Sequence, residues 1–172
     1  MAHGILLLGL NGCGKTTVGR RLAAELGFSA LDAEDFYFPA PGDYSRSRAA
    51  DEAHALMRSA IASGGDFVLS CVRCNLPHEI LAQVQLCVVL HLSPEARAQR
   101  IHQRQFSRYG SRILPGGDLY EEHQRFASFA AARSEETVAA SLSRLECPVV
   151  EIDAAPDADE IVRRILLCWT DR

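Results

Sequence analysis

Short apolar runs alternate along the chain with longer segments in which apolar residues recur at helical spacing. Two of the runs, at 66–71 and 86–92, are almost continuously apolar, which is typical of parallel strands covered on both faces of a sheet. Three further runs, at 4–10, 28–32 and 148–152, are compatible with strands. The pattern therefore predicts five strands.

Helical periodicity fills the segments between these runs. Val18, Leu22 and Leu26 are spaced by four residues, and Gly27 marks the end of that helix. Further helices are predicted over 46–62, from Ser93-Pro94 onward, over 119–130 and over 157–169. Strands that alternate with helices indicate an α/β fold around a parallel sheet of about five strands.

Size and charge narrow the possible function classes. A chain of 172 residues with 48% apolar residues is expected to form a single domain over 1–172. The net charge of -4 and the pI near 5.8 argue against a nucleic-acid or anionic-membrane partner, although a local basic patch stays open. We expect a monomer or a small homo-oligomer.

The chain lacks an apolar segment of the roughly 20 residues that a membrane helix needs, and its start does not resemble a signal peptide. We therefore expect a cytoplasmic protein without a membrane partner. Reduced thiols in apolar surroundings fit that compartment. The six cysteines are Cys13, Cys71, Cys74, Cys87, Cys147 and Cys168.

The stretch GLNGCGKT, residues 9–16, matches the pattern G-x-x-x-x-G-K-[ST] at every fixed position. Its glycines allow successive backbone N–H groups to surround a phosphate at the start of a helix, Lys15 reaches the β- and γ-phosphates, and Thr16 offers a hydroxyl to Mg²⁺. The order strand, loop, helix favours this interpretation over a chance match. The predicted nucleotide-binding residues are Gly9, Asn11, Gly12, Cys13, Gly14, Lys15, Thr16 and Thr17, with Cys13 at a variable position and without a catalytic role.

Three acids follow the second predicted strand: Asp32, Glu34 and Asp35. Open α/β sheets bind ligands at the carboxyl ends of their strands, so one acid is suited to a water of a Mg²⁺ bound with Thr16. Another can accept the proton of an acceptor hydroxyl. Asp32 is the expected metal ligand, Asp32 or Asp35 the catalytic carboxylate, and Asp35 a substrate contact; a solvated turn is the alternative.

Four arginines, Arg97, Arg100, Arg104 and Arg108, are spaced three, four and four, and Arg112 follows in a loop bounded by glycine and proline. On a continuous helix they would share one face. Mobile arginines that close over a transferring phosphate would neutralise its charge, so we expect a lid at about 104–118 with Arg104, Arg108 and Arg112 as catalytic cations. The alternative is a solvated basic helix face.

The segment SCVRCN after the third strand contains one more candidate cation. Arg73 would lie on the same rim of the sheet and is a candidate substrate-binding residue. Cys71 and Cys74 form a single C-x-x-C, but no second pair stands at zinc spacing, so buried structural thiols are expected.

GLNGCGKTTVGRRLAAELGF followed by LDAEDF resembles the opening of the shikimate kinase and gluconate kinase group, within the nucleoside monophosphate kinase-like P-loop fold. The resemblance implies a three-layer P-loop NTPase fold with strand order 2-3-1-4-5, helices on both faces and an arginine-rich lid. It also implies an acceptor-binding helical region at about 36–65 and adenine between the lid and the segment at 152–159. The Asp32, Glu34, Asp35 spacing and SCVRCN depart from shikimate kinases and are closer to gluconate kinases.

These observations predict an ATP- and Mg²⁺-dependent small-molecule kinase whose acceptor carries a hydroxyl or a phosphate. Two alternatives stay open. One is a nucleotide-binding or hydrolysing regulator without an acceptor, although the base-reading N-K-x-D sequence of GTPases is absent. The other is a kinase of nucleoside monophosphates or RNA that uses the basic stretch at 97–112.

Overall fold

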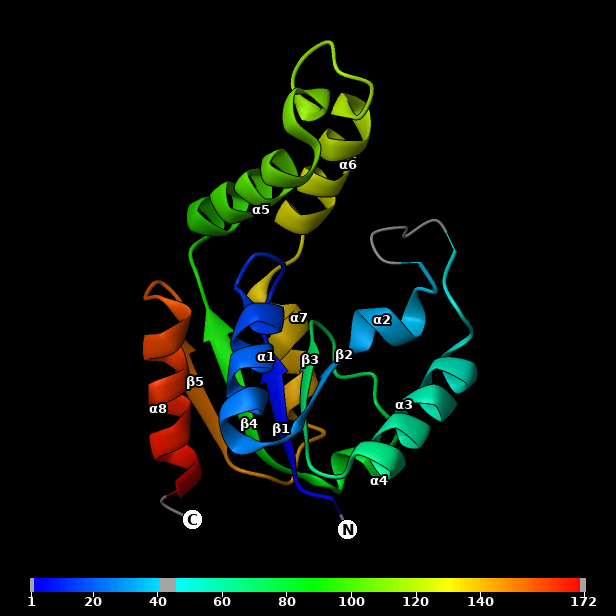
Figure 1. The fold of residues 1–172 in the computed structure, drawn as a ribbon, viewed down its shortest axis with the longest axis vertical. Helices are drawn as coiled ribbons and strands as arrows, with labels where there is room; N and C mark the ends of the chain where they lie inside the picture. The colour runs from blue at the N-terminus through cyan, green and yellow to red at the C-terminus, as the bar shows by residue number, and fades with distance from the viewer. Residues whose placement is uncertain (1, 41–45, 171–172) are drawn as a thin grey trace.

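A computed structural model describes residues 2–40 and 46–170 of the chain. Its centre is a five-stranded parallel sheet in the order β2-β3-β1-β4-β5, which confirms the predicted topology (Figure 1). The strands are β1 (Gly4–Leu8), β2 (Ser29–Asp32), β3 (Phe67–Cys71), β4 (Val84–His91) and β5 (Val149–Asp153). The helices are α1 (Lys15–Leu26), α2 (Ala33–Tyr37), α3 (Ala50–Gly64), α4 (His78–Leu81), α5 (Pro94–Tyr109), α6 (Tyr120–Ala131), α7 (Glu135–Leu142) and α8 (Ala158–Thr170), with a 3-10 turn η1 (Gly110–Ile113).

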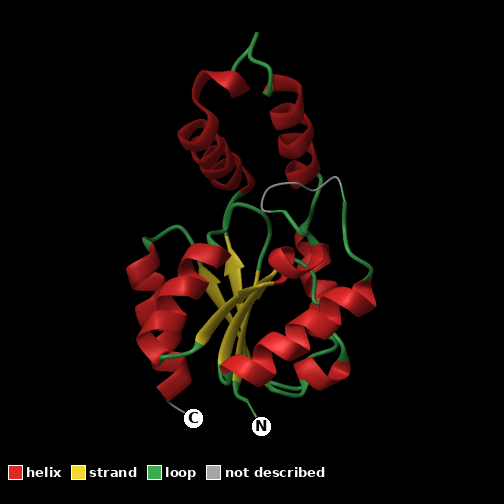
Figure 2. Cartoon of the chain, turned by 45° about the vertical axis from the view of Figure 1, so that its right-hand side comes forward, coloured by secondary structure: helices red, strands yellow, loops and turns green. Residues whose placement is uncertain are grey.

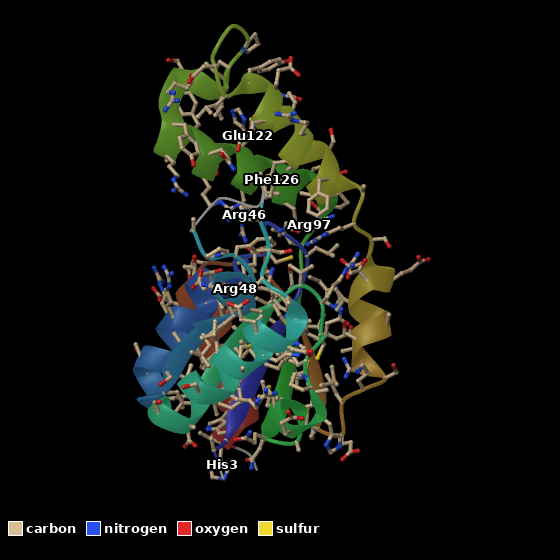
Figure 3. The ribbon with its side chains drawn as sticks, turned by 90° about the vertical axis from the view of Figure 1, so that its right-hand side faces the viewer. His3, Arg46, Arg48, Arg97, Glu122 and Phe126 are labelled. Atoms are coloured by element: carbon tan, nitrogen blue, oxygen red, sulfur yellow. The ribbon has the colours of Figure 1, made fainter. Side chains whose placement is uncertain are left out.

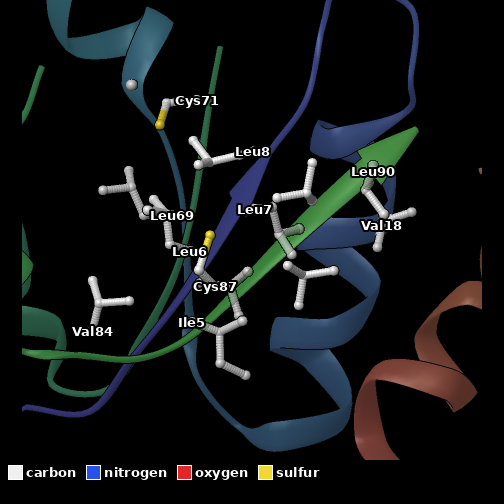
Figure 4. Packing of buried hydrophobic residues seen from close by; sticks show 14 of the residues in the cluster. Ile5, Leu6, Leu7, Leu8, Val18, Leu69, Cys71, Val84, Cys87 and Leu90 are labelled. Carbon is white, nitrogen blue, oxygen red and sulfur yellow. The ribbon is translucent and has the colours of Figure 1, made fainter. Parts of the chain in front are cut away.

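Burial along the strands explains their order. All residues of β1 and β3 are buried, and β4 is buried except near its ends, whereas β2 and β5 at the edges are partly exposed. The most apolar runs therefore occupy the centre of the sheet, as expected for strands covered on both faces. Leu6, Leu69 and Cys87 pack on one face of this centre, and Leu7 and Leu90 lie with Val18 on the face toward α1 (Figure 4).

Helices cover both faces of the sheet. α1 and α8 pack together on one side, and α3 and α4 lie on the other (Figure 2). Their ends use the predicted caps: Gly27 closes α1 with φ of 69°, and the Ser93 hydroxyl accepts a hydrogen bond from the backbone N–H of Ala96 at 3.2 Å. None of the helices described combines the length and the apolar composition that a membrane crossing requires.

The predicted helix over 46–62 begins later than the periodicity indicates, at Ala50. Ala49 precedes it in an extended conformation, and the backbone N–H of Arg48 donates to the carbonyl of Tyr37 at 2.7 Å instead of facing a helical partner. Three short helices were not predicted at all: α2, α4 and α7. The expected acceptor-binding region at about 36–65 spans α2 and α3, and its residues 41–45 lie outside the described part of the chain.

Helices α5 and α6, joined through η1, stand away from the sheet as a pair, here called the arm (residues 94–131) (Figure 1). The predicted lid at about 104–118 forms its outer part. α5 buries only Arg97 and Ile101, and α6 buries only His123 and Ala130, so the arm has little apolar anchorage in the core. Elements with few buried apolar contacts open at low cost in free energy.

A substitution at Leu22 would measure how much the packing of α1 on the sheet contributes to the free energy of unfolding. Its side chain is fully buried, so Leu22→Ala should lower the free energy of unfolding by about 2–5 kcal/mol in denaturant titrations. Leu167→Ala on α8 is the matched control, because the Leu167 side chain is 66% exposed and its loss should cost less than about 0.5 kcal/mol. Equal losses in the two variants would contradict this packing.

Candidate active site

The phosphate loop, residues 9–16, connects the end of β1 to α1 and has the conformation that the motif predicts. Gly12 and Gly14 both have φ of 91°, a left-handed region that favours glycine. A Cβ on Gly12 would lie 2.7 Å from the carbonyl oxygen of Arg97, so the loop and the base of α5 are in close contact. Cys13 is buried, and burial raises the pKa of its thiol, so only its backbone is available to a phosphate.

Lys15 begins α1 directly beside the loop and is the only lysine among the 18 basic residues of the chain. Its side chain is buried, and the Nζ atom donates to the carbonyl oxygen of Leu10 at 3.1 Å. Burial lowers the pKa of Lys15, while the nearby Cys13, Glu34 and Asp32 act in the opposite direction. An ammonium held in this way lacks a full set of partners and is suited to phosphate oxygens.

Thr16 and Asp32 meet across the end of the sheet. The Thr16 hydroxyl donates to the Asp32 carboxylate at 2.7 Å, and the same carboxylate caps α2 by accepting the backbone N–H of Glu34 at 3.1 Å. A hydroxyl beside a carboxylate suits Mg²⁺, which usually keeps several waters and takes few protein ligands in addition to phosphates. Within the described residues, no group of three or more histidine, cysteine or acidic side chains is arranged to hold a metal by itself.

The other acids of the motif are less enclosed. Asp35 on α2 is exposed, and its pKa is raised by partial burial of the carboxyl and by the charge of Asp32, with Arg20 opposing the shift. Glu34, unlike Asp35, lines the large cleft described below. The structure thus puts Asp32 next to Thr16 and leaves Asp35 accessible to a ligand.

A cleft of about 950 Å³ separates the arm from the sheet. Asn11 of the phosphate loop lines it together with Arg20 of α1 and Glu34 and Phe38 from the α2 region. The arm contributes the predicted Arg104, Arg108 and Arg112, and also Gln105, Tyr109, Ile113, Leu119, Glu122, His123, Arg125, Phe126, Phe129 and Arg133 just after α6. Figure 3 shows Glu122 and Phe126 on the arm and Arg46 and Arg48 on the core side.

The first four predicted arginines lie on one continuous helix, α5, whereas Arg112 lies in η1, and their surroundings differ. Arg97 is buried at the phosphate loop, and its Nε atom has no hydrogen-bond partner among the described residues. Arg100 donates to the carbonyl of Ala155 at 3.2 Å, next to the segment at 152–159. Arg112 forms an ion pair with Asp118 at 2.6 Å. The backbone and Cβ of Arg97 contact Gly12, and a buried guanidinium nitrogen without a partner on this residue fits a loop that receives an anion.

Arg73 lies apart from the large cleft. It lines a separate cavity of about 240 Å³ with Asn75, Thr137 and Arg144, between the loop after β3 and α7. Arg144 is fixed there, because its guanidinium donates to the carbonyls of Cys74 and Leu76 at 2.6 and 2.8 Å. A substrate role for Arg73 stays a prediction, and it would need an acceptor that reaches beyond the cleft.

Arg133 was not predicted, although it joins the arm to the phosphate loop. Its Nη1 donates to the side-chain oxygen of Asn11 at 2.8 Å, and its guanidinium lies 4.4 Å from the ring centroid of Phe129. Asn11 and Arg133 are 122 positions apart in sequence. The spacing of residues cannot reveal such a pair.

The family model described as an AAA domain matches residues 5–123, which include the phosphate loop, the acids and most of the arm. The chain belongs to this AAA-domain family of P-loop proteins. The matched segment contains the whole P-loop motif at residues 9–16.

Relatives place this P-loop protein near small-molecule kinases. It is 27% identical to "Uncharacterized protein YqaC" of Bacillus subtilis strain 168 over 96% of this chain and 97% of that one. It is 30% identical to shikimate kinase 2 of Pectobacterium atrosepticum over 60% of this chain and 65% of the relative. The sequence resemblance to shikimate kinases is thereby confirmed as a distant relationship.

Solved structures show the same fold. A shikimate kinase from Acinetobacter baumannii in complex with shikimate aligns with a TM-score of 0.59 at 19% identity, over 100% of this chain and 96% of that chain. A gluconokinase from Sinorhizobium meliloti 1021 aligns with a TM-score of 0.55 at 21% identity, over 96% and 90%. The predicted kinase fold is therefore confirmed.

Gly12 tests the phosphate loop without changing charge. Gly12→Ala places a Cβ 2.7 Å from the carbonyl of Arg97 at a positive φ, so ATP affinity measured by titration calorimetry should fall more than about ten-fold. In the matched variant Gly27→Ala the φ is also positive, but nothing lies within 4 Å of the new Cβ. That variant should lose stability and keep its ATP affinity, and unchanged affinity in Gly12→Ala would argue against the loop as the nucleotide site.

A histidine pair holds the two helices of the arm together. His102 Nδ1 lies 3.2 Å from His123 Nε2, and the buried His123 Nδ1 has no hydrogen-bond partner among the described residues. Burial, and then the neighbouring His102, lower the pKa of His123 below its ordinary value of 6.5. Between these two pKa values the unfolded arm binds more protons than the folded arm, so stability is lost as the pH falls below 6.5.

We therefore expect amide hydrogen exchange in α5 and α6, corrected for its intrinsic pH dependence, to become faster between pH 7.5 and about 5.5. His123→Gln should reduce this pH effect, whereas His78→Gln, at an exposed position on α4, should leave it unchanged. A pH effect of the same size in all three proteins would show that another group is responsible.

Proposed function

We propose that the protein is an ATP- and Mg²⁺-dependent phosphotransferase that moves the γ-phosphate of ATP to a small-molecule acceptor bound in the cleft. One observation carries the proposal: a single cleft is bounded by the phosphate loop, by the α2 region after the acidic motif and by the arginines of the arm. A donor site, a carboxylate and mobile cations are the parts that phosphoryl transfer requires. Kinship with shikimate kinase 2 supports the same reaction class.

The donor side consists of the phosphate loop and the start of α1. The N–H groups around Gly12 and Gly14 would bind the phosphates, and Lys15 would exchange its contact with the Leu10 carbonyl for β- and γ-phosphate oxygens. Thr16 and Asp32 would hold Mg²⁺, which neutralises charge that develops on the phosphates. Adenine would lie near Arg100 and Ala155, where α5 meets the loop after β5.

The acceptor side is the part of the cleft between the arm and α2, where Glu34 lines the cleft and Asp35 is the next residue along α2. For a hydroxyl acceptor, the raised pKa of Asp35 suits a base that takes up the proton as the new bond forms. Arg104, Arg108 and Arg112 line the cleft from the arm. Their approach would stabilise the loose transition state and exclude water, so that transfer outpaces hydrolysis.

Lys15 is the most direct test of this assignment. Lys15→Ala should reduce acceptor-stimulated ADP production by about 10²–10³-fold, because the cation at the β- and γ-phosphates is lost. Arg21→Ala is the control: Arg21 is an exposed cation on the same helix whose partner is Asp159, outside the cleft. Normal turnover by a folded Lys15→Ala protein would contradict the proposal, and slow ATP hydrolysis that no acceptor stimulates would point to a nucleotide-binding regulator instead.

A further inference from the structure

The cleft is strongly cationic although the chain as a whole carries a net charge of -4. Two glutamates, Glu34 and Glu122, line it against six arginines: Arg20, Arg104, Arg108, Arg112, Arg125 and Arg133. Four of the six, namely Arg20, Arg104, Arg108 and Arg125, form no ion pair with any residue over 2–40 and 46–170. The phosphate loop and Lys15 already provide for the triphosphate, so these cations favour a second anion in the cleft.

The same cleft has flat apolar walls. Phe38 lines it from the core, and Tyr109, Phe126 and Phe129 line it from the arm. Phe129 is 53% exposed to solvent, and an arginine guanidinium already stacks on its ring. A purine or pyrimidine gains from stacking on such rings, whereas a hydroxyl-rich sugar acid offers no flat apolar face for them to contact.

A polar side chain in the cleft and the volume of the cleft both fit a nucleobase. Gln105 lines the cleft between Arg104 and Arg108, and its amide supplies one acceptor and two donors, the combination that matches the edge of a nucleobase. The cleft volume of about 950 Å³ is near the upper end of the range for small-molecule sites. An acceptor of sugar-acid size would leave much of it to water.

Taken with the proposed function, on which this step rests, we infer that the acceptor is a nucleoside monophosphate. Its base stacks on the aromatic side chains of the arm, Gln105 contacts the base edge, and the unpaired arginines hold its phosphate. The arginines bind the phosphate and the aromatic side chains bind the base. A free base or a phosphorylated sugar would therefore contact only one of these two sets.

The transfer balances without an additional reactant. An oxygen of the mononucleotide phosphate forms a bond to the γ-phosphorus, and the bond from that phosphorus to the β,γ-bridging oxygen breaks. The products are a nucleoside diphosphate and ADP. Because the attacking oxygen is already anionic at neutral pH, no proton has to be removed, and Asp35 would position the acceptor rather than act as a base.

The first experiment compares acceptors with the full-length protein, ATP and Mg²⁺. ADP formation and the phosphorylated product are followed by ³¹P NMR with ribo- and deoxyribonucleoside monophosphates, the matching unphosphorylated nucleosides, gluconate and shikimate. We expect one or more monophosphates to yield a diphosphate and the other compounds to remain unchanged. Transfer to gluconate, shikimate or an unphosphorylated nucleoside, with none to the monophosphates, would overturn the inference while leaving the proposed kinase function in place.

Absence of transfer to every compound in the panel would count against the inference as well. The proposed function is then judged separately, by whether Lys15→Ala removes ATP binding and turnover. The acceptor panel thus tests whether the acceptor is a nucleoside monophosphate, and the Lys15→Ala variant tests separately whether the protein is a kinase.

A second experiment tests the aromatic wall with a matched pair of variants. Phe129→Leu keeps an apolar side chain and removes the flat ring, so the KM for the monophosphate should rise about ten-fold while the KM for ATP changes less than two-fold. Phe106→Leu alters the other highly exposed phenylalanine of the arm, which is 45% exposed and does not line the cleft, and should change neither constant. Equal effects of the two substitutions, or none from Phe129→Leu, would contradict stacking.

Asp35→Asn provides an independent readout. With a phosphate acceptor the substitution should raise the KM for the acceptor and leave kcat within about ten-fold, because no proton is transferred. A larger loss of kcat, typical of a missing general base, would instead indicate a hydroxyl acceptor.

Discussion

Strand β1 is hydrogen-bonded on both sides, to β3 and to β4, and every one of its residues is buried. Such a strand cannot shift without breaking two ladders and exposing its leucines, so the loop that follows it starts from a fixed point. The loop then leads into α1, whose N-terminal N–H groups and dipole favour an anion. The rigidity of the site thus derives from the most apolar segment of the chain.

The arm depends on a different kind of contact. Its helices bury few residues, and two hydrogen bonds tie it to the core: Arg133, just after α6, donates to Asn11 of the phosphate loop, and Arg100 donates to the carbonyl of Ala155. Both core partners lie where a nucleotide is expected, so a bound nucleotide would compete with these bonds or reorganise them. The position of the arm would then respond to occupancy of the donor site, which is the behaviour expected of a lid.

Much of this architecture could be predicted from the sequence because its signals are local. The apolar runs at 66–71 and 86–92 became β3 and β4, and the Asp157–Glu160 spacing became a cap in which the Glu160 N–H donates to Asp157 at 2.9 Å. The helices that were missed have four to eight residues, too few for several repeats of a helical period. α7 is also rich in small and polar residues, which weakens its apolar stripe.

The candidate site was predictable to a similar degree and for the same reason. The phosphate loop, Asp32 and the series on α5 depend on spacing within one segment. The contact of Arg133 with Asn11, the meeting of His102 with His123 and the separation of Arg73 from the cleft depend on how distant segments pack. The assigned roles of the predicted residues remain predictions until variants are measured.

All of the Lys and Arg residues of the chain except Lys15 are arginines. Because Lys15 is the only lysine, its ε-amine is the only side-chain amine in the molecule, and burial lowers its pKa. Acylating or aldehyde reagents therefore have a single side-chain amine to modify, and it lies in the phosphate loop. Protection of that one amine would report directly on occupancy of the nucleotide site.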